Sequence, residues 1–193
     1  MRLFTGVDLP AEVVGNLDGL LERLRHKGTD DGKRSSVPQR IQWSPPGNLH
    51  ITTKFIGEWP EERLDELKAA LAALPARPVI PIHIHRLGFF PNPHSPRVLT
   101  CGVEAPGLEA LAKGTGGATA ALGIESEKRA FSPHLTLARI RARVNLQPLR
   151  EAIAALPSQD FGRFEAAHFF LYQSKLQAGG SVYTKLAEFS LSK

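Results

Sequence analysis

Two histidines stand in matching contexts at two distant points of the chain. His50 is followed two positions later by Thr52, and His134 is followed in the same way by Thr136. Side chains alternate along a β-strand, so each imidazole is expected on the same face as its threonine hydroxyl. Two imidazoles around one phosphodiester can act as general acid and general base, and the hydroxyls can donate hydrogen bonds to phosphate oxygens. The residue types therefore indicate phosphodiester cleavage and leave open which histidine is the acid.

A single histidine on a strand would carry little weight, because most such residues are half-buried or solvated. The repeat of the whole His-x-Thr pattern favours catalysis over that explanation. An alternative from another class is a non-catalytic module that grips the end of an RNA. Binding alone does not require two titratable groups with threonine companions, so we favour an enzyme.

The segments around these motifs show the periodicities of strands and helices in a repeated order. Apolar residues recur at spacings of three and four in the helical segments, and they alternate or form short runs in the strand segments. In the first half the predicted elements are a strand at 2–7, a helix at 11–25, strand segments between 41 and 57, a helix at 60–74 and a strand at 79–88. In the second half they are a strand at 97–103, a helix at 107–122, a strand at 134–136, a helix at 147–156 and strands at 161–172 and 181–190.

This repeated order indicates an internal duplication, with halves at approximately 1–96 and 97–193. Strands mixed with helices predict an α+β fold. We expect a bilobal, pseudo-two-fold molecule in which two mainly antiparallel sheets face a central cleft and the helices lie outside. Because the strand at 97–103 serves both copies, the lobes are expected to share strands, and residues 1–193 are expected to form a single domain.

The composition is that of a globular protein with a modest positive charge. Of the 193 residues 42% are hydrophobic and 22% are charged, and the formal net charge of +5 suits RNA or another anionic partner. No apolar run reaches the roughly 18 residues of a membrane helix, and the N-terminus lacks the pattern of a secretory signal. The only cysteine, Cys101, excludes an internal disulfide and a cysteine-rich metal site. We therefore expect a cytoplasmic monomer with no membrane partner. The polar stretch 27–40 either guides an RNA strand or is a loop without function, and the sequence leaves both open.

The two motifs and their flanks resemble a known superfamily. HITTKFIG at 50–57 and PHLTLAR at 133–139 are similar to the two H-x-[ST]-x motifs of the 2H phosphoesterases. The resemblance is closest to their RNA 2′,3′-cyclic phosphodiesterase branch, also described as LigT-like 2′-5′ RNA ligases, and it covers nearly the whole chain. The departures are Thr53, where that branch usually has leucine, and Thr100 with Cys101, where a bulkier residue is frequent.

The resemblance implies a specific reaction without a metal or organic cofactor. Such enzymes open a 2′,3′-cyclic phosphate at an RNA 3′ end and leave a 2′-phosphomonoester. By carry-over, His50 would be the proton donor to the departing 3′ oxygen, and His134 would be the proton acceptor that activates water. Thr52 and Thr136 would hold the non-bridging phosphate oxygens. The implied partner is an RNA with a cyclic phosphate end, for which tRNA fragments are one source. An alternative is that the same site acts as a 2′-5′ RNA ligase or a 2′-5′ phosphodiesterase on tRNA halves or small oligonucleotides.

Two cations next to the motifs are further candidates for binding the phosphate. Arg139 matches an arginine typical of the family's second motif, although strict alternation turns it away from the face of His134. We expect it to contact the phosphate, because strands commonly twist or end at such a point. Strict alternation places Lys54 on the face of His50 and Phe55 on the opposite face, so Lys54 is either a substrate contact or a solvated lysine.

Four more residues are candidates for contacts with the nucleotide. Arg129 and Phe131 precede the second motif and could clamp a nucleotide by charge and stacking, although Phe131 could equally be core. Phe90 precedes a proline-rich loop, and Tyr172 lies in a stretch that resembles the family.

His83 and His85 form a separate pair on one face of a predicted strand and could be the edge of a metal site. No third ligand lies near them in the sequence, so we interpret them as solvated strand residues and predict no metal site.

Overall fold

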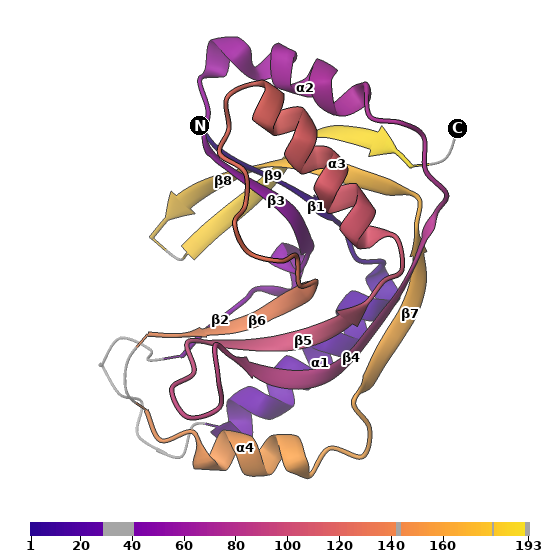
Figure 1. The fold of residues 1–193 in the computed structure, drawn as a ribbon. Coiled ribbons are helices and arrows are strands. Elements are labelled where there is room, and N and C mark those ends of the chain that lie inside the picture. Colours follow the sequence, from indigo (N-terminus) through magenta and orange to yellow (C-terminus); the bar gives the residue numbers. More distant parts are fainter. Residues whose placement is uncertain (29–40, 142–143, 179, 192–193) are drawn as a thin grey trace.

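The strands and helices follow the repeated order that the sequence predicts. This computed structural model describes residues 1–28, 41–141, 144–178 and 180–191 (Figure 1). The helices are α1 (Ala11–Gly28), α2 (Leu64–Ala72), α3 (Leu108–Ala121) and α4 (Gln147–Ala154), with single 3-10 turns η1 (Pro46–Asn48) and η2 (Glu61–Arg63). The strands are β1 (Arg2–Val7), β2 (Ile41–Trp43), β3 (Ile51–Glu58), β4 (Ile80–Phe90), β5 (Val98–Glu104), β6 (His134–Ile140), β7 (Asp160–Ala166), β8 (His168–Gln177) and β9 (Gly180–Ser190). Most of the stretch 27–40 lies outside the described residues.

The described strands form one curled, nine-stranded sheet. Together with the four described helices this mainly antiparallel sheet confirms the predicted α+β class. The order of its strands is β7-β4-β5-β6-β3-β1-β8-β9, with β2 paired to β6. The sequence predicts two facing sheets, whereas here a four-stranded arm and a five-stranded arm, the latter including β2, are joined where β3 meets β6. That junction is a single antiparallel bridge between Ile51 and Leu135. Figure 1 shows the two arms curving away from this junction.

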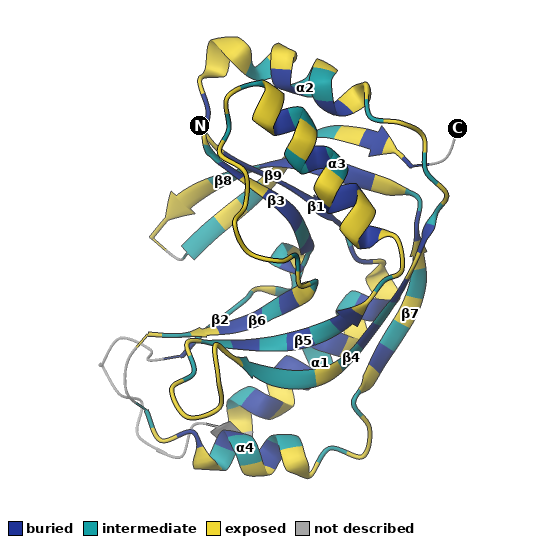
Figure 2. Cartoon of the chain, viewed as in Figure 1, coloured by how far each residue is buried: buried dark blue, intermediate teal, exposed yellow. Residues whose placement is uncertain are grey.

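Each arm of the sheet takes elements from both halves of the sequence. The first lobe contains β3, β1, β8 and β9 and is covered by α2 and α3. The second lobe contains β6 with β2 paired to it, β5, β4 and β7, and it is covered by α1 and α4. Figure 2 shows that the helices bury one side and expose the other, as their periodicity predicts. None of the described helices is long and apolar enough to cross a membrane.

The single strand predicted at 161–172 is wrong, because two strands occupy that range. β7 ends at Ala166 and pairs with β4 in the second lobe, whereas β8 begins at His168 and pairs with β1 in the first. The chain therefore crosses between the lobes at Ala167. Hydropathy could not locate this crossing, because strand-like residues continue on both sides of it.

Candidate active site

The bridge between the two lobes positions the two His-x-Thr motifs. Ile51 lies opposite Leu135, and the two strands run antiparallel. The residues that flank this pair therefore place His50 next to Thr136 and Thr52 next to His134, all on one face of the sheet. The structure thus brings together the four side chains that the spacing had singled out.

Both imidazoles are held by the same backbone contact. Nδ1 of His50 lies 2.7 Å from the carbonyl oxygen of Asn48, and Nδ1 of His134 lies 2.9 Å from that of Ser132. A carbonyl oxygen only accepts, so in each ring Nδ1 carries the hydrogen and Nε2 is left to exchange a proton. In the first motif the Thr52 hydroxyl lies 3.0 Å from Nε2 of His50. The two rings are therefore oriented as an equivalent pair.

The two histidines differ in their surroundings. The ring of His50 packs against Phe4 at 4.7 Å, Tyr183 at 5.0 Å and Tyr172 at 5.9 Å between centroids. This burial lowers the pKa of His50, and the opposing effects of the Asn48 carbonyl and the Asp8 carboxylate do not restore it. The side chain of His134 is exposed at the start of β6. The free protein therefore favours the neutral form of His50.

A β-bulge follows each histidine by three residues. On β3, Thr52 and Lys54 pair with consecutive residues of β1, so no β1 residue lies opposite Thr53 in the strand register. On β6, Thr136 and Ala138 pair with consecutive residues of β5, so no β5 residue lies opposite Leu137. A bulge of one residue inverts the alternation beyond it. Side chains five positions after each histidine consequently return to its face.

Arg139 lies on the face of His134 for this reason. It pairs with Val98, which shares a face of β5 with Thr100, the partner of Thr136. The pKa of His50 is lowered mainly by burial, and the positive charge of Arg139 adds a smaller contribution. The sequence favoured a phosphate contact because strands twist or end, but the bulge is the feature that turns this side chain.

The prediction that Lys54 shares the face of His50 is wrong. Lys54 is only 8% exposed, and its Nζ donates a hydrogen bond of 2.8 Å to the carbonyl oxygen of Glu125. The residue that returns to the His50 face is Phe55, which pairs with Phe4 and is 58% exposed. Strict alternation had placed Phe55 on the opposite face, and the sequence contains no clear signal for the bulge that moves it.

Tyr172 lies beside His50 but is almost fully covered. Its ring stacks on Phe4 at 4.9 Å with an interplanar angle of 9°. The hydroxyl is buried and makes no hydrogen bond within the described part of the chain. Burial, with a contribution from Asp8, raises the pKa of Tyr172, so the hydroxyl stays protonated and can donate.

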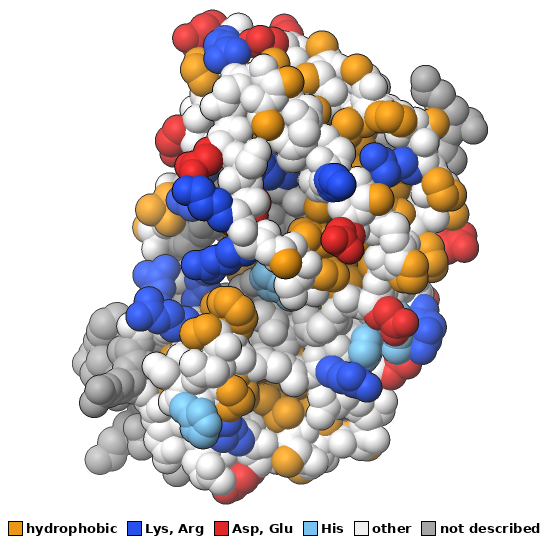
Figure 3. Space-filling model, viewed as in Figure 1, with side chains coloured by type: hydrophobic (Ala, Val, Ile, Leu, Met, Phe, Trp, Pro, Cys, Tyr) orange, Lys and Arg blue, Asp and Glu red, His pale blue; other side chains and the backbone are white. Residues whose placement is uncertain are grey.

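The remaining candidates lie at the margins of the site. Phe90 is 56% exposed and pairs with Val98, which in turn pairs with Arg139. Phe90 and Arg139 therefore lie in one row across three neighbouring strands. Arg129 is exposed in the segment before β6, whereas Phe131 is half-buried and packs against the core. Figure 3 shows Lys and Arg side chains gathered beside the hollow between the lobes, near β6 and the β8–β9 hairpin.

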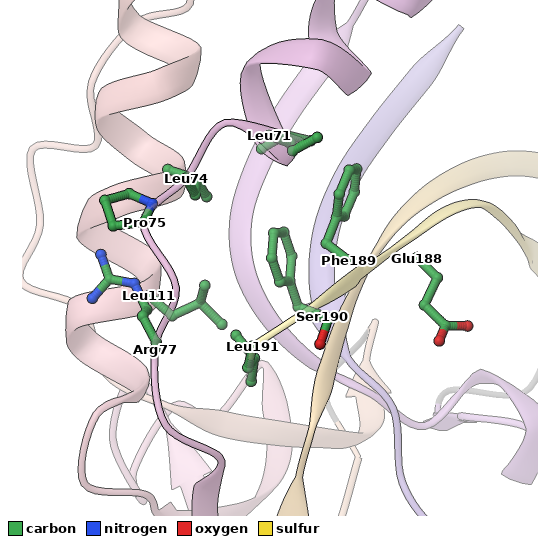
Figure 4. A pocket seen from close by; sticks show the side chains of 11 residues that line it. Leu71, Leu74, Pro75, Arg77, Leu111, Glu188, Phe189, Ser190 and Leu191 are labelled. Atoms are coloured by element: carbon green, nitrogen blue, oxygen red, sulfur yellow. The ribbon is translucent and has the colours of Figure 1, made fainter. Parts of the chain in front are cut away.

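A partly open pocket lies elsewhere in the molecule and is lined by none of these residues. It has a volume of about 210 Å³ and lies between α2, α3 and the end of β9 (Figure 4). Leucine and phenylalanine side chains such as Leu71, Leu111 and Phe189 line it, with Arg77 at one side. Its apolar lining does not suit a phosphate, so the exposed histidine face remains the candidate site.

Comparison with known proteins identifies the family of the chain. The sequence profile of a family described as LigT like Phosphoesterase matches residues 7–100 and 102–183. The chain belongs to the LigT-like phosphoesterase family. A LigT-like relative from Methanocaldococcus jannaschii, named RNA 2′,3′-cyclic phosphodiesterase, is 33% identical over 189 residues that cover 97% of this chain and 99% of the relative. One of the same name from Thermus thermophilus is 35% identical over 202 residues, covering 99% and 90%.

Solved structures of LigT-like proteins share the fold. A Thermus thermophilus protein, TT0787, superposes with a TM-score of 0.78 at 31% identity and covers 99% of this chain and 98% of its own. Escherichia coli LigT in complex with 3′-AMP gives a TM-score of 0.76 at 26% identity, covering 100% and 98%.

Proposed function

We propose that this chain opens the 2′,3′-cyclic phosphate at the 3′ end of an RNA and leaves a 2′-phosphomonoester. The observation that carries the proposal is the paired His-x-Thr geometry across the Ile51–Leu135 bridge, with both Nδ1 atoms held by backbone carbonyls. The names of the relatives supply the substrate class, since two curated relatives are RNA 2′,3′-cyclic phosphodiesterases.

The phosphate is held by neutral donors and one cation. The hydroxyls of Thr52 and Thr136 donate to its non-bridging oxygens from either side of the bridge. The guanidinium of Arg139 stabilises the negative charge that develops as water adds to phosphorus. The ring of Tyr172 packs beside that of His50 and helps to position it.

Two proton transfers accompany the exchange of bonds at phosphorus. Nε2 of His134 takes a proton from the attacking water, and a new P–O bond forms. The P–O3′ bond breaks, and His50 gives a proton to the departing 3′ oxygen while the 2′ ester stays intact. Burial lowers the pKa of free His50, and the negative charge of a bound phosphate would raise it again. Substrate binding thus supplies the proton donor in the required state.

The test uses an RNA oligonucleotide that ends in a 2′,3′-cyclic phosphate, incubated in EDTA. We expect a 2′-phosphate product from the wild type, a loss of about 10²–10⁴-fold in kcat for His50→Ala and for His134→Ala, and full activity for the control His94→Ala. His94 is exposed in the loop after β4 and belongs to neither motif. Full activity in either motif variant, or dependence on a divalent ion, would overturn the proposal.

The same groups act in the reverse direction if a 5′-hydroxyl RNA replaces water. Such a reaction joins two RNA ends through a 2′-5′ linkage, by microscopic reversibility of the two proton transfers. Adding a 5′-hydroxyl oligonucleotide to the assay measures the ratio of ligated to hydrolysed product.

We further propose that tRNA fragments with cyclic phosphate ends are the source of substrate in the cytoplasm, and that the chain acts as a monomer. Both histidines, both threonines and Arg139 come from one chain, so no second copy is needed to complete the site. Activity that is linear in protein concentration, with a monomer mass in solution, is the expected result.

A further inference from the structure

We propose that His83, His85 and Glu104 form a site for a divalent transition-metal ion such as Zn²⁺. The sequence showed only two of these residues together and gave no reason to expect a third. The structure supplies it, because β4 pairs with β5 in a register that places Glu104 directly opposite His83. His85 follows two positions along the same strand, so all three side chains share one face.

The ligand atoms of the three side chains converge on one point. They lie within 4.8 Å of one another, with the Glu104 carboxylate 3.7 Å from Nδ1 of His83 and 3.8 Å from Nε2 of His85. A tetrahedral zinc ion with bonds near 2.1 Å needs ligands roughly 3.4 Å apart. Small side-chain rotations close this difference, and the Glu104 side chain is 67% exposed and free to make them.

A neighbouring carboxylate prepares His83 for this role. Oδ2 of Asp160 on β7 lies 3.1 Å from Nε2 of His83, on the side of the ring away from Glu104. Metal-binding histidines commonly donate their second ring nitrogen to a carboxylate, which fixes the ring and leaves the other nitrogen unprotonated. Nε2 makes no hydrogen bond of good geometry to Asp160, and Nδ1, which lies toward Glu104, is likewise buried without a hydrogen bond among the described residues. A metal ion would give Nδ1 its missing partner.

The donor set decides the class of ion. Two imidazoles and one carboxylate suit Zn²⁺, Co²⁺ or Ni²⁺, whereas Mg²⁺ and Ca²⁺ prefer oxygen ligands alone. A pocket of about 390 Å³, lined in part by His83, Glu104 and Arg163, gives an ion access from solvent. In Figure 3 histidine, acidic and basic side chains adjoin one another over β4 and β7. A fourth position would be open to water.

The proposed ion would lie outside the proton-transfer site. His85 pairs with Gly102, and Gly102 pairs with His134, so the two histidines are separated by two strand spacings, about 10 Å. An ion there cannot touch a phosphate held between the two motifs. Loss of the ion should leave cyclic-phosphate hydrolysis intact, which keeps this proposal separate from the proposed function.

The test measures Co²⁺ and Zn²⁺ binding to untagged protein at neutral pH. Co²⁺ absorbance reports the coordination, and competition with a chromophoric chelator gives the Zn²⁺ affinity. We expect at least about 10-fold weaker Zn²⁺ binding in His83→Ala, His85→Ala and Glu104→Gln, and a smaller loss in Asp160→Asn. The matched control is His168→Ala, which removes an exposed histidine paired with Glu188 at 3.3 Å on another strand pair.

Two further measurements keep the outcome decisive. Apo variants in EDTA should unfold cooperatively, and Zn²⁺ should raise the Tm of the wild type but not of His85→Ala. Because His50 and His134 could themselves bind Zn²⁺, the double variant His50→Ala/His134→Ala is titrated as well. Unchanged affinity in both His83→Ala and His85→Ala, or loss of binding in that double variant alone, would overturn the proposal.

Discussion

The two motif strands share their geometry and differ in what surrounds them. Each has a histidine held through Nδ1 by the carbonyl two residues earlier, and each has a bulge three residues later. His50 nevertheless lies among the aromatic rings of the first lobe, whereas His134 is exposed at the start of β6 in the second. The two motifs thus share the contacts that orient the rings, and they differ in how far each ring is buried.

This difference shows how a nearly symmetric site can perform an asymmetric reaction. An acid and a base must hold opposite protonation states at one pH, and environment is the means by which identical side chains acquire them. Burial favours neutral His50 in the free protein, so His50 can serve as the acid only when the charge of a bound phosphate raises its pKa again, whereas His134 is exposed. The predictions below test whether the two halves are as unequal in function as they are in structure.

The largest expected effect distinguishes the histidine that acts as general acid from the one that acts as general base. In a substrate whose bridging 3′ oxygen is replaced by sulfur, the leaving group needs no proton. We expect His50→Ala to lose about 10²–10⁴-fold with the oxygen substrate and far less with the sulfur substrate. His134→Ala should lose a similar factor with both, because activation of water is unaffected by the leaving group.

The matched variants are each other's control in this experiment, since they remove the same ring from equivalent positions. Rescue of His134→Ala by sulfur, with no rescue of His50→Ala, would reverse the roles of the two histidines. Equal behaviour of both variants would refute the inequality of the two halves altogether.

The next effect compares the two side chains that the bulges return to the histidine face. Arg139→Ala removes a charged phosphate contact, so we expect about 10–100-fold lower kcat/KM and a weaker salt dependence. Phe55→Ala removes an exposed ring suited to base stacking, so we expect a raised KM with an unchanged salt dependence. Arg139→Lys and Phe55→Tyr are the conservative controls. If Phe55→Ala changed the salt slope and Arg139→Ala did not, the assignment of the two positions would be wrong.

These bulges also limit how much of the site can be predicted from the sequence. Period-two and period-3.6 patterns found most of the elements, and the repeated His-x-Thr pair identified the face that matters. Lys54 and Phe55 were misplaced because one unpaired residue inverts every later position, and no composition signal marks that residue. Glu104 and Asp160 could not be linked to His83, because strand pairing between distant segments depends on tertiary packing that local patterns do not contain.

A smaller effect follows from the tight contact behind the first motif. A Cβ at Gly6 would lie 2.8 Å from the carbonyl oxygen of Ile51 and 3.5 Å from Cδ2 of His50. One at Gly102 would lie 2.9 Å from the carbonyl oxygen of His85. Both Gly6→Ala and Gly102→Ala should lower the free energy of unfolding by about 1–3 kcal/mol.

The two glycine variants should lose similar free energies of unfolding in urea, but their kcat values should differ. Gly6→Ala pushes on the strand that carries His50, so kcat should fall. Gly102→Ala pushes on β4 instead, so kcat should be better retained and Zn²⁺ binding should weaken. A larger loss of kcat in Gly102→Ala than in Gly6→Ala would mean that the close contact of Gly6 with Ile51 does not hold His50 in place.

The smallest effect is the pH dependence that burial of His50 imposes on stability. In the unfolded chain this histidine regains its ordinary pKa of about 6.5, whereas the folded protein holds the pKa lower. Below that pH the unfolded chain binds a proton that the folded protein resists, so the free energy of unfolding falls as pH decreases. Urea denaturation at about pH 7.5 and about pH 5.5 should show this loss in the wild type and a reduced loss in His50→Gln, which cannot titrate. The exposed His134 is the comparison: His134→Gln should retain the part of the loss that His50 causes. An equal pH dependence in the wild type and in His50→Gln would mean that the aromatic surroundings do not set the proton affinity of this ring, and the asymmetry between the lobes would need another cause.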